Sequence, residues 1–144
     1  MKRTITLAAL AVLREAAAQN KHIDFYTADL SSKDVISRIR HHGIPQKPEV
    51  LVEHFKAFQR IVRITQGMAL EVPWILLEMG WTSAMEIAVL SRVEFVSRLT
   101  EDGRIEKATA EKIHKRARLR RAELLPHYMN ILQNNEPHIS QAAI

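Results

Sequence analysis

The sequence predicts an all-α fold, a compact bundle of about six or seven helices with a helix-hairpin-helix-like corner and a long basic final helix. Three observations favour this class. The 144 residues include only 4 Gly and 5 Pro, which weaken helices, whereas the helix-favouring Ala, Leu, Glu and Arg are frequent. The chain contains no alternating run of β-branched residues, which would indicate strands. Its length is sufficient for one hydrophobic core.

Residues 4–19 predict the first helix. The basic start at Lys2 and Arg3 and the short apolar run that follows are similar to a secretory signal, but Arg14 and Glu15 interrupt the run. We therefore expect an uncleaved amphipathic helix. The connection at residues 20–30 is irregular, and we expect its apolar side chains to hold it against the core: Ile23, Phe25, Tyr26 and Leu30.

Two more helices are predicted next. Residues 31–43 form the first, which a serine caps and Gly43 stops. Pro48, which suits a first helical turn, starts a stronger helix that ends near Gly67. This helix carries an apolar core stripe: Leu51, Phe55, Phe58 and Val62. It also carries a basic stripe: Lys56, Arg60 and Arg63.

A corner of short helices follows. Residues 73–79 predict a helix, with Gly80 at its left-handed exit. Two short helices come next, each starting at a serine or threonine cap. The second carries the S-x-x-E capping box of Ser91 and Glu94, in which the hydroxyl and the carboxylate each satisfy a backbone N–H.

Residues 104–125 predict the long final helix. We expect Pro126 to break or kink it before residues 127–135, because proline cannot donate the helical hydrogen bond. The predicted domains are an N-terminal helical segment at residues 1–44, a helical core with the corner at residues 45–134, and a tail without periodicity at residues 135–144.

The sequence offers no recognisable catalytic or metal-binding motif. Without Cys there is no thiolate zinc site and no thiol nucleophile, and none of the 7 His stands at H-x-x-x-H spacing. A glycine-rich phosphate loop is also missing. We therefore expect no enzyme activity, no cofactor and no metal. No apolar run approaches the ~20 residues that span a bilayer.

The final helix carries much of the positive charge. The formal net charge is +5, and residues 104–121 hold eight cations against two acids: Arg104, Lys107, Lys112, Lys115, Arg116, Arg118, Arg120 and Arg121. On a helical wheel they spread around more than half the circumference and leave a narrow apolar seam: Ala110, Ile113, Ala117 and Leu124. Such a helix is mostly solvated or packs against an acidic surface of a partner.

Nucleic-acid binding is the alternative function. The corner resembles DNA-binding helix-hairpin-helix units, whose two glycines let backbone N–H groups approach a phosphate. Gly80 is present, but Thr82 stands in place of the second glycine and Trp81 adds bulk at the tip. The basic segment at residues 104–121 also lacks the aromatic residues on which bases stack.

A wider pattern extends over roughly residues 50–130. It comprises Gln59, Arg60, Arg63, Thr65, Leu76, Leu77, Gly80, Ser83, Ala84, Ile87, Ala88, Phe95, Ala110, Ile113, His114 and Ala117. This pattern resembles the N-terminal helical region of the A subunits of Tc toxin complexes, the Salmonella virulence plasmid A protein type. The resemblance implies a non-enzymatic role in virulence, because such subunits are large oligomeric delivery proteins and this region belongs to their helical outer shell. The family proteins are much longer.

We therefore predict a protein-interaction or assembly module of a toxin-delivery particle: a structural subunit, an adaptor or the leading fragment of an A subunit. Its partners would be other protein subunits, in a homo-oligomer or a larger toxin assembly, and it would be cytoplasmic before assembly. The predicted interaction surface is Lys56, Arg60, Arg63, Trp81, Lys112, Lys115, Arg116, Arg118, Arg120 and Arg121. For Trp74 and Trp81, core packing is the alternative.

Overall fold

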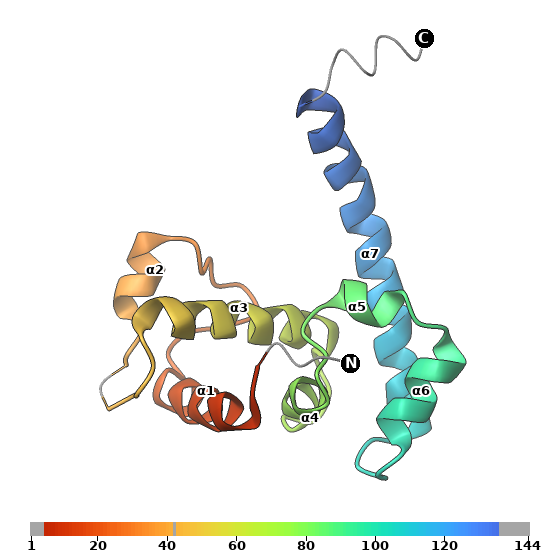
Figure 1. Cartoon of the computed structure of the whole chain (residues 1–144), viewed down its shortest axis with the longest axis horizontal. Coiled ribbons are helices and arrows are strands. Elements are labelled where there is room, and N and C mark those ends of the chain that lie inside the picture. The colour runs from red at the N-terminus through yellow and green to blue at the C-terminus, as the bar shows by residue number, and fades with distance from the viewer. Residues whose placement is uncertain (1–4, 42, 136–144) are drawn as a thin grey trace.

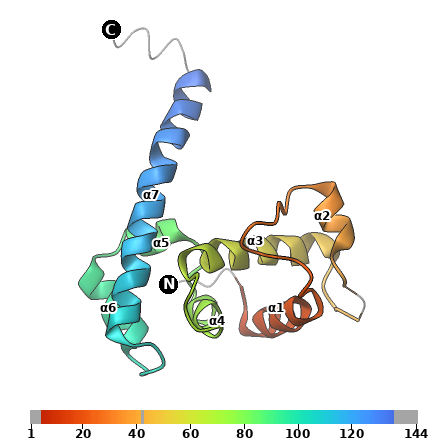
Figure 2. The same ribbon diagram turned by 180° about the vertical axis from the view of Figure 1, so that it is seen from behind.

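The computed structural model describes residues 5–41 and 43–135, which form seven α-helices and no strand (Figure 1). The helices are α1 (Leu7–Gln19), α2 (Lys33–Arg38), α3 (Pro48–Ile64), α4 (Val72–Glu78), α5 (Ala84–Ala88), α6 (Arg92–Thr100) and α7 (Lys107–Asn135). The predicted all-α fold is therefore confirmed. The C-terminal half of α7 extends away from the other helices in both views (Figures 1 and 2). The predicted tail, apart from its first residue, lies outside the described residues.

Helix α3 is central to the fold. Helices α1 and α4 lie along one flank of it, and α2 lies on the opposite flank (Figures 1 and 2). The first three residues of its predicted apolar stripe are buried, and Val62 is partly buried against the same core. Full burial of such a side chain stabilises a fold by roughly 1.5–3 kcal/mol. Leu10 and Leu13 of α1 belong to this core, so the N-terminal segment packs with the central helices.

A buried asparagine fixes the path of the chain after α1. The amide nitrogen of Asn20 donates to the carbonyls of Ala16 and Arg40, both at 2.8 Å. Its side-chain oxygen accepts from the backbone N–H of Arg40 at 2.6 Å. Because both backbone groups of Arg40 are taken by this side chain, α2 ends at Arg38. The predicted end at Gly43 is therefore wrong.

The connection between α1 and α2 is mostly apolar on its inner side. Phe25 and Leu30 are buried and Ile23 is partly buried, as predicted. Tyr26 is 38% exposed, so its predicted place in the core is wrong. The carboxylate of Asp24 accepts from the Tyr26 N–H at 3.0 Å. This turn directs Phe25 inward and leaves Tyr26 at the surface.

The predicted corner closes α4 with two backbone hydrogen bonds. Gly80 has φ +96°, a left-handed conformation that glycine adopts without steric cost. Its N–H donates to the Leu77 carbonyl at 3.0 Å, and the N–H of Trp81 donates to the Leu76 carbonyl at 2.9 Å. This is a Schellman motif, in which the residue after the glycine also packs against the last turn of the helix. The predicted exit at Gly80 is confirmed.

The predicted capping box at the start of α6 is only half formed. The Ser91 hydroxyl accepts from the Glu94 N–H at 3.1 Å, as expected. The Glu94 carboxylate instead pairs with Arg98 at 2.8 Å, because the two residues are one turn apart on the same face. The reciprocal bond to the Ser91 N–H was therefore wrongly predicted.

Helix α7 packs against α5 and α6 through its first half. Ala110, Ile113 and Ala117 of the predicted seam are fully buried. The helix continues through Pro126, so the predicted break there is wrong. Proline leaves the Ala122 carbonyl without its helical donor, but both residues are exposed, and water can satisfy that carbonyl.

Replacing Asn20 with Ala tests the hydrogen bonds between its side chain and the Arg40 backbone. We expect Asn20→Ala to lower the free energy of unfolding by about 1–3 kcal/mol, because the Arg40 backbone groups lose their partner. Urea denaturation measures this, and Gln19→Ala, on the exposed side of the same turn, is the control. Equal stability of the two variants would contradict the role given to Asn20.

We expect the partly buried His54 to make the fold less stable in acid. Burial lowers the pKa of His54 from its ordinary 6.5, against the opposing charge of Glu53. The unfolded chain therefore binds this proton more readily, and the free energy of unfolding falls as the pH drops below 6.5. We expect His54→Gln to lose less stability than the parent between neutral pH and pH ~5 in urea denaturation. His127→Gln, at an exposed position, is the matched control for the loss of an imidazole.

Candidate interaction surface

The basic stripe predicted on α3 and two of the cations predicted on the final helix meet at one groove. The groove has a volume of about 590 Å³ and lies where the end of α3 faces α7. We call it the arginine groove and define it by Tyr26, Arg63, Ile64, Gln66, Arg116, Leu119, Arg120 and Glu123. Arg63 belongs to the stripe on α3, and Arg116 and Arg120 belong to α7. Three guanidinium groups from distant parts of the sequence thus converge on one concavity.

Arg116 also holds the two helices together. Its Nη1 donates to the carbonyl of Gln66 at 2.7 Å and to that of Ile64 at 3.4 Å. The last carbonyls of a helix have no partner within it and carry partial negative charge, so a guanidinium here is a favourable cap. Arg116 was predicted as an interaction residue, and the structure adds a structural role for it as the cap of α3.

The other two arginines of the groove are held by weaker contacts. The Nε of Arg63 donates to the Tyr26 carbonyl at 3.3 Å, and the side chain of Arg63 is exposed. Arg120 pairs with Glu123 at 3.3 Å on the same helix, and the two side chains are 40% and 66% exposed. Exposed pairs of this kind contribute about 0–1 kcal/mol. An incoming carboxylate can therefore replace Glu123 at low cost.

The rest of the basic stripe on α3 extends the positive surface. Lys56 and Arg60 line a neighbouring groove of about 390 Å³ beside residues 27–31, and Arg63 lines this groove as well as the arginine groove. Lys56 pairs with Glu53 at 3.2 Å, whereas Arg60 is exposed.

The remaining predicted cations of α7 lie elsewhere. Lys112, Lys115 and Arg118 are exposed and line a different groove that also includes Arg92. Arg121 is half-buried and lines neither groove; its buried Nε has no hydrogen-bond partner among the described residues. The structure therefore does not bring all the cations of this helix to one face.

Trp81 does not belong to any surface. Only 2% of this residue is exposed, and its ring meets Phe95 edge-on with centroids 5.3 Å apart. The prediction of Trp81 as an interaction residue is wrong, because the Schellman turn at Gly80 packs the next residue against α4. Trp74 is half-buried and stacks on Phe58 at 4.4 Å.

The tip of the hairpin-like corner is occupied by a carboxylate. Glu86 Oε1 accepts from the Thr82 N–H at 2.9 Å and from its hydroxyl at 2.5 Å. The Ser83 hydroxyl in turn accepts from the Glu86 N–H at 3.3 Å. This arrangement was not predicted, although Ser83 and Glu86 have the same S-x-x-E spacing as Ser91 and Glu94 at the start of α6. A helix-hairpin-helix unit offers backbone N–H groups of this kind to a phosphate. Here the Thr82 N–H donates to the Glu86 carboxylate instead.

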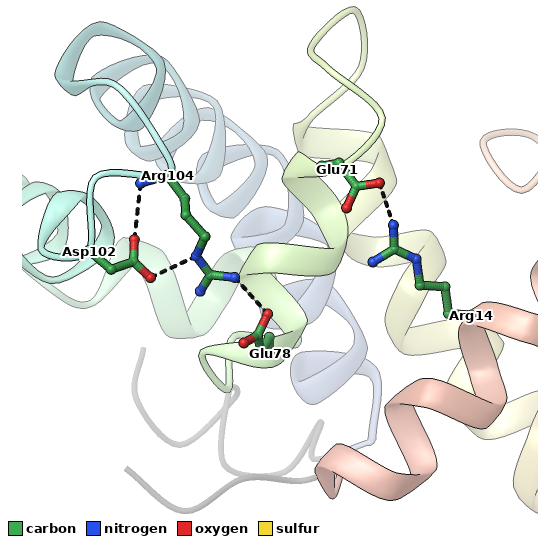
Figure 3. Close-up of polar contacts among 5 residues, drawn as sticks. All are labelled: Arg14, Glu71, Glu78, Asp102 and Arg104. Carbon is green, nitrogen blue, oxygen red and sulfur yellow. Dashed lines mark hydrogen bonds and ion pairs between the residues drawn. The ribbon is translucent and has the colours of Figure 1, made fainter.

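Two ion-pair systems hold α4 at its ends (Figure 3). Glu71 at its start pairs with Arg14 of α1. Glu78 at its end pairs with Arg104 at 2.8 Å, and Arg104 also binds Asp102 at 2.7 Å. Hydrogen bonds to these two carboxylates raise the pKa of Arg104, and the Arg104 backbone N–H lowers the pKa of Asp102. Arg104 therefore adds little unpaired charge to the basic segment.

The described residues include no group of three or more His, Asp or Glu side chains arranged to hold a metal ion. The buried His114 has its Nε2 2.8 Å from the Leu90 carbonyl, which fixes α7 against the end of α5. Within the described part of the chain, no helix has both the length and the apolar character required to cross a membrane.

The dual role of Arg116 predicts a specific stability effect. We expect Arg116→Ala to lower the free energy of unfolding by about 1–2 kcal/mol, because α3 loses its charged cap. Arg118→Ala, at an exposed position two residues away, should change it by less than about 0.5 kcal/mol. Thermal and urea denaturation of both variants check this, and similar stability of the two would refute the cap.

Comparison of the chain with protein-family models, with curated proteins and with solved structures finds no match. The similarity to Tc toxin A subunits remains a prediction from the sequence.

Proposed function

We propose that this chain is a non-enzymatic protein-interaction module and that its arginine groove binds an acidic segment of another protein. The observation that carries the proposal is the convergence of Arg63, Arg116 and Arg120 on one groove. Guanidinium groups bind carboxylates through paired, charge-assisted hydrogen bonds. Tyr26 and Leu119 line the same groove and are 38% and 56% exposed, so a bound segment would also find apolar contacts there.

The distribution of charge favours a protein segment over a nucleic-acid duplex. A duplex offers a regular track of phosphates, and proteins typically neutralise about 6–10 of them along it. The cations of α7 are divided between two grooves instead. At the corner, the Glu86 carboxylate accepts from the Thr82 N–H and would repel a phosphate. Arginine and aromatic residues together are typical of protein interfaces.

The biological setting of the module is a second part of the proposal. The sequence pattern that resembles Tc toxin A subunits supports a place in a toxin-delivery particle, as a structural subunit, an adaptor or a leading fragment. An acidic segment of a neighbouring subunit would then be the natural occupant of the groove.

Charge reversal in the groove tests the binding mode. The probe is a short fluorescein-labelled peptide of Glu and Asp, titrated with the protein and followed by fluorescence anisotropy. We expect the double variant Arg63→Glu with Arg120→Glu to bind at least about tenfold more weakly, a loss of about 1.4 kcal/mol. The matched control is Lys112→Glu with Arg118→Glu, which makes the same charge change in the other groove.

An equal loss in both double variants would mean non-specific attraction and would refute the groove as the site. Titration with duplex DNA provides the competing outcome. Duplex binding with a log–log salt slope of about −0.9 per phosphate contacted would support the nucleic-acid alternative instead.

A further inference from the structure

A second concavity adjoins the arginine groove. It has a volume of about 590 Å³ and lies between α1, the end of α3 and the start of α4. Its lining includes Ala18 of α1, Phe58 and Val62 of α3, Met68 of the following loop, and Trp74 of α4. We call it the tryptophan cleft. Clefts of 300–1,000 Å³ with mostly apolar walls are the usual size and character of binding sites in proteins.

The cleft has an aromatic floor. Trp74 stacks on Phe58 with ring centroids 4.4 Å apart and planes 20° apart, and Phe25 meets Phe58 edge-on at 5.5 Å. Trp74 remains half-buried, so part of this large ring is available to a ligand. Leu70 on the rim is 88% exposed. A half-open aromatic floor with an apolar rim is suited to an apolar side chain, because burial of such a group from water is strongly favourable.

An ion pair spans the edge of the cleft. Arg14 lies over the Trp74 ring, with its guanidinium carbon 5.6 Å from the ring centroid, and pairs with Glu71. Figure 3 shows the two side chains reaching toward each other from α1 and α4. Their side chains are 51% and 61% exposed, so the pair is weakly held and can rearrange around a bound group.

The cleft and the groove are adjacent. Tyr26 and Gln66 line both of them. An extended peptide advances about 3.3 Å per residue, so a chain lying in the arginine groove reaches the tryptophan cleft within a few residues. The two concavities therefore offer adjacent charged and apolar subsites to one segment.

We propose that the tryptophan cleft is the anchor pocket of the same partner and takes one aromatic or long aliphatic side chain located a few residues from the acidic stretch. This inference rests on the proposed function of the arginine groove. Interfaces typically derive much of their affinity from a few buried anchor residues, with surrounding charges adding steering and specificity. The partner is therefore defined chemically as an acidic segment with a single apolar anchor.

Two matched peptides test the anchor. Both are fluorescein-labelled and rich in Glu and Asp, and they differ only in carrying Phe or Ala at one position, which is moved along the peptide in a series. For the best position, we expect the Phe peptide to bind the parent protein about tenfold more tightly than its Ala counterpart. Binding should also change the fluorescence of Trp74. Trp81→Phe isolates this signal, since the chain has 2 Trp and the Trp81 Nε1 makes no hydrogen bond within the described structure.

An uncharged substitution in the lining of the tryptophan cleft tests whether the preference for the Phe peptide arises there. Ala18→Gln adds bulk to the cleft without changing charge, and we expect it to reduce the preference for Phe toward equality. Ala11→Gln is the control, because Ala11 is also exposed on α1 but does not line the cleft. Circular dichroism establishes that both variants are folded.

The outcomes separate this inference from the proposed function. If both peptides bind equally well and still depend on Arg63 and Arg120, the anchor pocket is refuted and the groove stands. A Phe preference that survives Ala18→Gln also refutes the cleft as its origin. If neither peptide binds at any position, the proposed function fails and the anchor fails with it.

Discussion

The end of α3 leaves backbone carbonyls that need donors, and the way in which the chain supplies them determines where its basic surfaces meet. Thr65 supplies donors to the carbonyls of Ile61 and Val62. Arg116, about fifty residues further along on α7, donates to the carbonyl of Ile64 and to that of Gln66 in the turn after α3. A hydrogen bond to a charged group that caps a helix end is stabilising and directional. The contact therefore fixes the position of α7 relative to α3. The arginine groove lies beside this contact, and Arg63 of α3 and Arg120 of α7 line it together with Arg116.

The formal charge of this protein is a poor guide to what its surface offers. Among the described residues, Arg14, Arg38, Arg98 and Arg104 are each paired with a carboxylate. Most of the cations on α3 and α7 line the arginine groove, the neighbouring Lys56–Arg60 groove or the separate Lys112–Arg118 groove. A partner would meet a few local clusters of cations, each with its own apolar neighbours. Such a surface discriminates by shape as well as by charge.

Much of the fold could be predicted from local rules. The apolar stripe of α3 and the left-handed exit at Gly80 depend on residues close in sequence, and both are found in the structure. Two of the errors come from partners that are distant or that compete. Asn20 ends α2 early from across the fold, and Glu94 bonds to Arg98 rather than to the serine of its capping box.

The candidate site was predictable only in part, for the same reason. The cations that line the groove were identified from the sequence, but periodicity within one helix cannot show which faces of two helices meet. The structural role of Arg116 requires the end of α3 to be beside it, and the burial of Trp81 requires the turn at Gly80 to pack it inward. Tyr26 was expected in the core and instead lines both concavities. This exposed tyrosine connects the charged subsite to the aromatic one.

The adjacency of these two subsites has an energetic consequence. Exposed ion pairs contribute little each and weaken as salt screens them over about 8–10 Å. A partner held by the arginine groove alone would therefore bind weakly and with little selectivity among acidic sequences. An apolar contact in the tryptophan cleft would not be weakened by charge screening and would depend on the position of a single side chain. In the proposed complex, charge would bring the partner to the surface and the cleft would select it. Neither the net charge nor the aromatic content alone would predict this division of roles.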